Sequence, residues 1–178
     1  MVLVTHLLPE RPSGRDLNEA ELLAFVHALS QRPAAWSGLV EHDPDRRRYA
    51  PLLRDEHLAV WLICWMDDHD TGFHDHDLSA GAVSVVEGAV REDRLVLGGG
   101  TVSRVAAAGE SFSFSAADIH RVMHAGAEPA VTLHAYSPPL WRMGAYEIAP
   151  TGELRRHSVS YAEELRPLAS ASEVTTAS

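Results

Sequence analysis

The feature that most restricts the fold is a series of short apolar segments between Leu58 and Ser160. Glycine, proline and aspartate interrupt the series about every 8–12 residues, a spacing typical of antiparallel β-sandwiches and small β-barrels. The predicted strands are 58–66, 80–86, 89–96, 101–106, 111–114, 119–124, 131–136, 144–148 and 154–160. We therefore expect an all-β domain.

One helix is expected before these strands. Its apolar residues recur at helical spacing, and they are Leu22, Leu23, Phe25, Val26 and Leu29. Asp16 is the expected N-cap, because Glu19 follows it three residues later, as in a capping box. Pro33 is expected to end the helix, and the charged segment 41–48 is expected to be a connector.

Composition divides the chain into three parts. Its 178 residues suit one domain, and 46% hydrophobic with 22% charged residues is typical of a globular protein. Residues 1–48 are the predicted helical extension, packed on a β-domain of residues 49–166. Residues 167–178 are rich in alanine, serine and threonine and are predicted to be a disordered tail.

Charge and cysteine content exclude several function classes. The formal net charge is −10, from 15 Lys+Arg and 25 Asp+Glu, so we expect no nucleic-acid partner and no membrane binding. No apolar run approaches the roughly 20 residues that span a bilayer, and the first residues lack the basic region of a signal peptide. Cys64 is the only cysteine, which excludes an intrachain disulfide. A cytoplasmic enzyme or binding domain, monomeric or weakly homo-oligomeric, is the expectation.

The chain has 11 histidines, and three of them form a candidate metal site. His74 and His76 flank Asp75, so on a strand both imidazoles point to the same face. A metal held by histidines usually needs a third protein ligand, and His120 opens a later predicted strand. We call His74, His76 and His120 the histidine triad. Imidazole suits iron and zinc alike, so the residues themselves leave the metal open.

A second group lies on the predicted strand 131–136. Thr132, His134 and Tyr136 alternate along it and therefore share one face. A hydroxyl, an imidazole and a phenol in a row form a hydrogen-bond relay whose last member, the phenol, can reach a bound ligand. We call these three residues the relay.

The glycines around the triad resemble the two sequence motifs of the cupins. Gly88 follows the histidine pair and Gly109 precedes His120, as the motif glycines do. Gly81 stands where ordinary cupins carry a glutamate ligand, and His124 stands at the asparagine of the second motif. Three neutral imidazoles leave a divalent metal its full charge and several open positions. Such a site favours an anionic, chelating substrate and leaves room for O2.

Residues 49–148 resemble the thiol dioxygenases, the cysteine dioxygenase family of the cupin superfamily. The relay is similar to that family's Ser-His-Tyr relay, with threonine in place of serine, and it is followed by the family's Ser-Pro-Pro. Three further segments are also similar: Ile63-Cys-Trp65, Val86-Glu-Gly88 and His120-Arg-Val122.

The resemblance implies both a fold and an activity. The fold would be a cupin-type small β-barrel, or jelly-roll, with a short N-terminal helical segment. The triad would bind Fe(II), and the relay would act on a small thiol that O2 oxidises to its sulfinic acid. All four electrons would come from the thiol, so no nicotinamide, flavin or 2-oxoglutarate would be needed, and the chain contains no GxGxxG motif.

Two departures from the family concern the substrate. Animal members carry, at the position of Gly81, a cysteine that forms a thioether with the tyrosine, and this chain lacks it. The family's arginine for the substrate carboxylate lies two residues after a tyrosine, where this chain has Pro51 after Tyr49. Arg54, Tyr49 and Arg142 are the candidate substrate contacts, and the choice of thiol stays open.

Two other functions are compatible with the same residues. One is a different three-histidine cupin dioxygenase, acting on a diketone or a flavonol. The other is a noncatalytic metal-binding cupin that senses or stores a small ligand. The relay and the Ser-Pro-Pro segment disfavour the first of these, whereas Pro51 leaves it open.

Overall fold

The computed structural model describes residues 7–149, 151 and 153–160, so the predicted tail 167–178 lies outside the described residues. The helical elements are α1 (Glu19–Ser30) and the 3₁₀ turns η2 (Pro33–Ala35) and η3 (Ser37–Leu39). The strands are β1 (Arg48–Arg54), β2 (Ala59–Trp65), β3 (Phe73–Asp75), β4 (Ala80–Glu87), β5 (Ala89–Leu95), β6 (Thr101–Ala107), β7 (Ser111–Phe114), β8 (His120–Ala125), β9 (Ala130–Ser137), β10 (Arg142–Ile148) and β11 (Leu154–Ser160). No helix in this part of the chain is long and apolar enough to cross a membrane.

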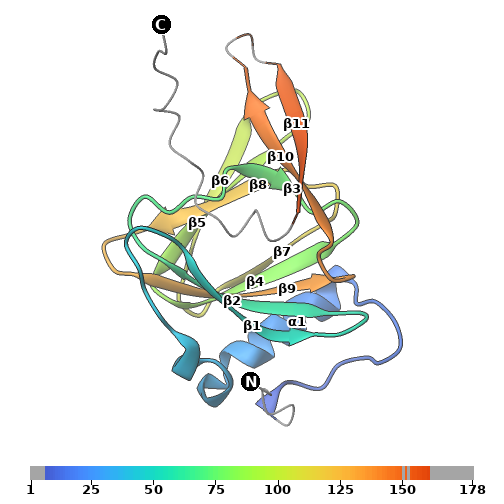
Figure 1. Ribbon diagram of the computed structural model, residues 1–178, viewed down its shortest axis with the longest axis vertical. Coiled ribbons are helices and arrows are strands. Elements are labelled where there is room, and N and C mark those ends of the chain that lie inside the picture. Colours follow the sequence, from blue (N-terminus) through green and yellow to red (C-terminus); the bar gives the residue numbers. More distant parts are fainter. Residues whose placement is uncertain (1–6, 150, 152, 161–178) are drawn as a thin grey trace, which may run out of the picture.

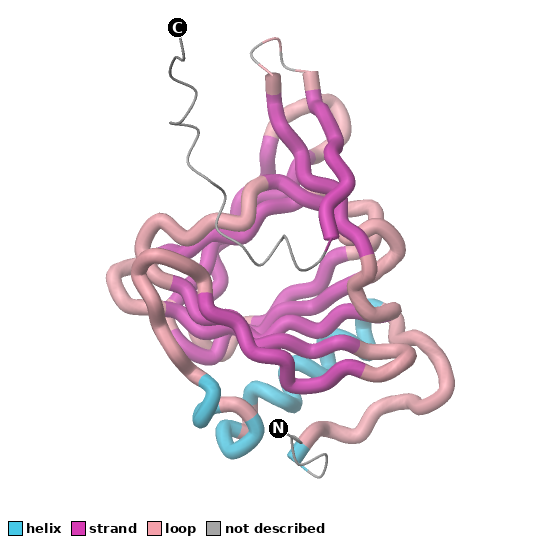
Figure 2. The backbone as a smooth tube through the Cα atoms, in the orientation of Figure 1, coloured by secondary structure: helices cyan, strands magenta, loops and turns pink. Residues whose placement is uncertain are grey.

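The strands form two antiparallel sheets that face each other (Figure 1). One sheet has the order β1-β2-β9-β4-β7, and the other has the order β11-β10-β3-β8-β5-β6. The β10–β11 hairpin projects beyond the body of the second sheet (Figure 1). Helix α1 covers the outer face of the first sheet by packing on β4, β7 and β9 (Figure 2). The expected all-β jelly-roll with a short N-terminal helical segment is confirmed.

Strand β9 is buried along its whole length because it is covered on both faces. Val131, Leu133 and Ala135 belong to the apolar core shared with α1, which includes Leu22 and Phe25 of the helix. The alternate residues of β9, which are those of the relay, therefore face the second sheet. This alternation brings the relay into the space between the sheets.

The nine strands expected from the sequence are confirmed within one or two residues at their ends, and the structure adds β1 and β3. Charged Arg48 and Arg54 and the proline at position 51 hide the apolar pattern of β1. Strand β3 has 3 residues, too few to show a period. Cys64 is 1% exposed in the core against α1, where burial raises the pKa of its thiol, as expected of a packing cysteine.

The expected helix is present, but its predicted N-cap was wrong. Asn18 caps α1, its side chain accepts the Glu21 N–H at 3.0 Å, and the Glu21 carboxylate accepts the Asn18 N–H at 3.0 Å. The Asp16 carboxylate instead pairs with His57 Nδ1 at 2.9 Å. The helix ends at Ser30, before the proline that was expected to stop it.

Candidate metal centre

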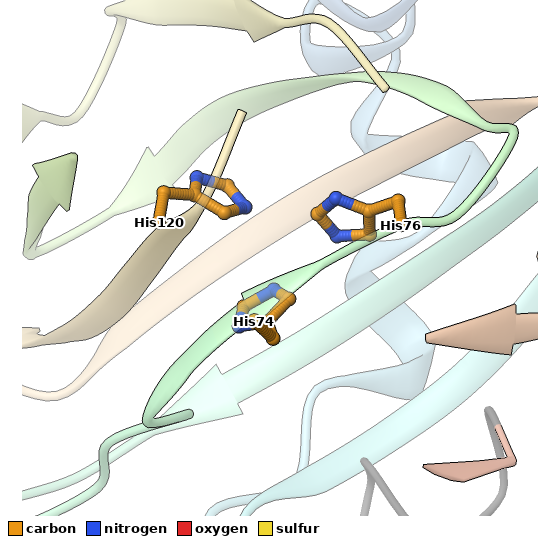
Figure 3. A group of neighbouring side chains, drawn as sticks. All are labelled: His74, His76 and His120. Carbon is orange, nitrogen blue, oxygen red and sulfur yellow. The ribbon is translucent and has the colours of Figure 1, made fainter. Parts of the chain in front are cut away.

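Strands β3 and β8 bring the histidine triad together between the sheets. His74 lies on β3 directly opposite His120 on β8, and His76 follows the last residue of β3. The three rings point toward one another, and their candidate ligand atoms all lie within 4.8 Å of each other (Figure 3). Each side chain is buried, with 5%, 1% and 1% exposure for His74, His76 and His120. The structure therefore brings together the three histidines that the sequence proposed as a metal site.

Hydrogen bonds orient two of the three imidazoles. His74 Nδ1 lies 3.0 Å from the carbonyl oxygen of Gly72, and His120 Nδ1 lies 2.7 Å from the Glu92 carboxylate. Both partners are acceptors, so each Nδ1 carries the proton and each Nε2 keeps a free lone pair. Metal-ligating histidines in proteins are typically held in this way.

Three further ring nitrogens of the triad are buried without a hydrogen-bond partner among the described residues. They are Nε2 of His120 and both nitrogens of His76. Burial, followed by the repulsion of the neighbouring His74, lowers the pKa of both rings well below the usual range. Neutral imidazoles with orphaned nitrogens that converge are what a divalent cation requires, so the residues present fit a bound metal.

An aromatic ring fills the space beside Gly81 and packs on the triad. The ring of Phe114 stacks on His76 with centroids 4.6 Å apart, and it lies 4.4 Å from the ring of His120. A Cβ atom at Gly81 would overlap this phenyl ring and would lie 3.1 Å from Cδ1 of Tyr136. The glycine therefore leaves the triad with imidazole ligands and gives Phe114 its space.

The relay is continuous and ends beside the triad. Thr132 Oγ1 lies 2.8 Å from His134 Nε2, and His134 Nδ1 lies 3.1 Å from the Tyr136 hydroxyl. The Tyr136 ring centroid is 5.2 Å from that of His76. Burial, and then the nearby Arg47 cation, lower the pKa of His134 to about 3, so its imidazole is neutral near pH 7.

A fourth residue extends the relay at its far end. The indole Nε1 of Trp65 donates a hydrogen bond to Thr132 Oγ1 at 2.7 Å. Trp65 is 0% exposed and belongs to the core between the sheets. Its polar role had no sequence signal, because a tryptophan on a buried strand is compatible with packing alone.

Among the candidate substrate contacts, Arg54 reaches the inner face of the first sheet through a β-bulge. The register of β1 against β2 shifts between Pro51 and Leu53. After this shift Arg54 lies opposite Ala59, which in turn lies opposite Tyr136 on β9. Directly paired residues share a face, so Arg54 and Tyr136 point to the same side. Its guanidinium donates to the carbonyl of Leu140 at 3.2 Å.

The other two candidate contacts differ in their surroundings. Tyr49 is 42% exposed and packs edge-on against Trp61, with centroids 5.9 Å apart. Arg142 donates to the Asp77 carboxylate at 3.0 Å, and 60% of its side chain is exposed. The structure thus brings Tyr49 to the inner sheet face, beside Ile63 in register, and leaves Arg142 on the rim in an ion pair.

Two buried carboxylates next to the triad had been missed. Glu92 holds His120, and Asp75 binds Arg156 at 2.7 Å and the Tyr146 hydroxyl at 2.6 Å. The signal of Glu92 in the sequence is charge within the predicted strand 89–96, since residues 91–94 read Arg-Glu-Asp-Arg, whereas Asp75 lies outside the nine predicted strands. Buried charge on a strand indicates a specific partner, but the sequence does not identify it.

Comparison with known proteins identifies the family. The family described as cysteine dioxygenase type I matches residues 10–149. The chain belongs to the cysteine dioxygenase type I family. Bovine (Bos taurus) cysteine dioxygenase type 1 is 25% identical over 147 residues, covering 76% of this chain and 72% of the relative. The rat (Rattus norvegicus) protein of the same name is 26% identical over 153 residues, covering 79% and 76%.

Solved structures support the fold of this cysteine dioxygenase family member. TT1209 from Thermus thermophilus has a TM-score of 0.51 at 20% identity, covering 57% of this chain and 92% of that chain. A double-stranded β-helix protein from Klebsiella pneumoniae has a TM-score of 0.51 at 16% identity, covering 57% and 80%. Likeness at these identities shows the double-stranded β-helix, or cupin, architecture.

Proposed function

We propose that this chain is an iron(II)-dependent thiol dioxygenase that oxidises cysteine or a related small thiol to its sulfinic acid with O2. The observation that carries the proposal is the buried histidine triad with the Tyr136 relay beside it, in a chain of this family. When bound by the triad, ferrous iron would supply open positions at which a thiolate and O2 meet.

The proposed reaction is balanced in atoms and electrons. A thiol, RSH, and O2 give RSO2H, so two S–O bonds form and the O–O bond breaks. The sulfur atom supplies four electrons, and the two oxygen atoms accept them. Neither a reducing cofactor nor a second organic substrate is needed.

The relay supports a defined direction of proton donation toward the substrate. An indole N–H can only donate, so Thr132 Oγ1 accepts from Trp65. The hydroxyl proton of Thr132 then has two acceptors, His134 Nε2 at 2.8 Å and the Ile63 carbonyl at 3.4 Å, and the shorter contact is favoured. Neutral His134 thereby keeps its proton on Nδ1 and donates it to the Tyr136 oxygen.

Tyr136 is the relay member that we propose as the catalytic contact. Its oxygen accepts from His134, so its own hydroxyl proton can be donated to a group at the triad. Such a donor stabilises negative charge that develops on a substrate oxygen or sulfur. Thr132 and His134, both buried on β9, fix the orientation of the Tyr136 hydroxyl through these hydrogen bonds.

For the substrate carboxylate, we propose Arg54 as the replacement for the arginine that Pro51 excludes. The bulge in β1 supports this role, because it turns Arg54 to the face that carries Tyr136. A guanidinium is suited to a carboxylate through paired N–H donors. Tyr49, on the same face, is proposed as a wall of the substrate site, and Arg142 as a secondary contact at its rim.

We further infer that the protein works in the cytoplasm as a monomer or weak homo-oligomer whose partners are a small thiol and O2. The unpaired, buried Cys64 is compatible with a reducing compartment. The net charge of −10 supports a small-molecule rather than a nucleic-acid partner.

The test is O2 uptake by anaerobically iron-loaded protein with cysteine, 3-mercaptopropionate, cysteamine or mercaptosuccinate, with products identified by mass spectrometry. We expect a sulfinate from at least one thiol. We also expect loss of turnover in His74→Ala, His76→Ala and His120→Ala, whereas His27→Ala on the exposed face of α1 is the matched control. Iron-loaded protein that consumes no O2 with any thiol would favour a noncatalytic metal-binding role.

A further inference from the structure

A buried carboxylate lies directly behind one histidine of the triad. Glu92, on β5, is 3% exposed, and its Oε1 accepts the Nδ1 proton of His120 at 2.7 Å. Strand β5 pairs with β8, so this carboxylate and the imidazole are carried by hydrogen-bonded neighbours in one sheet. The contact is therefore fixed by the fold.

The three triad residues differ in the charge of the group that accepts a hydrogen bond from Nδ1. His74 donates to a neutral backbone carbonyl, that of Gly72. His76 Nδ1 has no hydrogen-bond partner among the residues that the structure describes. His120 is the member of the triad that is bonded to a charged acceptor. Among the described contacts, His120 is thus the triad imidazole that is hydrogen-bonded to a carboxylate.

Two arginines bind the Glu92 carboxylate and hold it in this orientation. Arg104 Nε donates to Glu92 Oε2 at 2.7 Å, and Arg94 Nη2 donates to Oε1 at 3.2 Å. The guanidinium of Arg104 also lies 4.0 Å from the centroid of the Phe112 ring, which fixes it from the other side. Neither arginine has a hydrogen bond to His120 among the contacts described, so the carboxylate is the member of this cluster that bonds the ring.

We propose that Glu92 is a positioning residue that supplies negative charge to the metal centre through its hydrogen bond to His120. The ligand set itself has no carboxylate, because glycine stands at position 81, where the cupin motif has a glutamate. This inference rests on the metal site of the proposed function. An imidazole whose N–H is bonded to a carboxylate is a stronger donor through its other nitrogen, and its tautomer is fixed. Negative charge near a metal also favours its more positive oxidation state.

The test is the affinity of the full-length chain for Fe(II), measured anaerobically by competition with a chelator. Glu92→Gln keeps the shape and an acceptor oxygen but removes the charge. We expect its dissociation constant for Fe(II) to rise about ten- to a hundredfold. The Fe(III)/Fe(II) midpoint potential of the loaded protein should move to a more positive value. Glu92→Asp, which keeps the charge, should recover part of both changes.

Arg104→Gln is the matched control, because it removes a partner of Glu92 without touching His120. Thermal unfolding of the metal-free variants measures the structural cost, which we expect in both Glu92→Gln and Arg104→Gln. The Fe(II) dissociation constant of Arg104→Gln should stay within about threefold of wild type or fall, because its carboxylate is less neutralised.

Three outcomes would overturn the inference. If wild type binds Fe(II) and Glu92→Gln binds it with equal affinity and potential, the role of Glu92 is refuted and the proposed function stands. If Arg104→Gln weakens binding as much as Glu92→Gln does, the cluster is structural only. If correctly folded wild type does not bind Fe(II), the metal site itself fails, and this inference fails with it.

Discussion

At the scale of single residues, Gly81 and Phe114 form a coupled pair beside the triad. The glycine has no side chain, and the phenyl ring fills the space that a Cβ atom would need. That ring then packs on His76, His120 and Tyr136, all of which act in the proposed mechanism. The absence of a side chain at position 81 and the place of this aromatic ring therefore depend on each other.

Gly81→Ala tests this coupling. The added methyl group overlaps the Phe114 ring, so we expect the free energy of unfolding to fall by about 1–3 kcal/mol. Chemical denaturation measures the change. Combining Gly81→Ala with Phe114→Leu should restore part of the loss because the smaller side chain makes room. Additive losses in the double variant would refute a direct contact.

The hydroxyl of Tyr136 is the most specific atom in the proposed chemistry. Tyr136→Phe removes it and keeps the ring against His76. We expect kcat to fall about a hundredfold or more, a typical effect of losing a positioned proton donor, while Fe(II) affinity stays unchanged. Steady-state O2 uptake at saturating thiol checks the prediction. A kcat close to wild type would remove Tyr136 from the catalytic step.

At the scale of elements, the short strand β3 depends on the β10–β11 hairpin. Both oxygens of Asp75, the last residue of β3, accept bonds from Arg156 on β11, at 2.7 and 2.9 Å. Tyr146 and the Gly144 N–H of β10 bind the same carboxylate. A strand of 3 residues is thereby fixed from its outer face.

Arg156→Gln is expected to weaken this brace. It leaves a largely buried Asp75 carboxylate short of its strongest partner, so the free energy of unfolding should fall by about 1–3 kcal/mol. Denaturant unfolding and Fe(II) affinity are the readouts, and affinity should fall because β3 carries His74. Arg155→Gln, at the exposed neighbouring position, should change stability by no more than about 0.5 kcal/mol. Equal effects of the two substitutions would contradict the brace.

The sequence predicted correctly which side chains share a face where apolar and polar residues alternate along a strand. It did not predict structure that depends on contacts between residues far apart in the sequence. The alternation of β9 predicted the shared face of the relay, and the His-Asp-His segment predicted paired imidazoles. The cap of α1 was placed at Asp16 because two capping-box patterns overlap there, Asp16 with Glu19 and Asn18 with Glu21. The contact of Asp16 with His57, far away in the sequence, decides between them. The orientation of Arg54 depends on the bulge between Pro51 and Leu53, which the sequence of β1 does not predict.

At the scale of the whole molecule, buried neutral histidines couple folding to pH. The pKa of His134 falls from 6.5 to about 3, and those of His76 and His120 are also lowered. The unfolded chain therefore binds protons first as the pH drops below about 6.5. Stability of the metal-free protein is greatest above that pH and is lost as the pH falls toward about 3, by up to about 1.4 kcal/mol per pH unit for each histidine.

His134→Gln should make this dependence shallower between pH 6 and 4, because one of the groups that titrate only in the unfolded chain is removed. Denaturant unfolding of the metal-free protein across that range measures the slope. His157→Gln changes a largely exposed histidine on β11 and should leave the slope as in wild type. A slope unaffected by His134→Gln would show that this ring titrates alike in both states.

In the proposed reaction, both atoms of O2 are transferred to the sulfur of a small thiol. The most direct measurement is a single reaction of the iron-loaded protein with its preferred thiol under ¹⁸O₂, followed by mass spectrometry of the product. We expect a sulfinic acid with two labelled oxygen atoms, formed without any added reductant. A product with one labelled atom, a disulfide, or a requirement for an external reductant would contradict it.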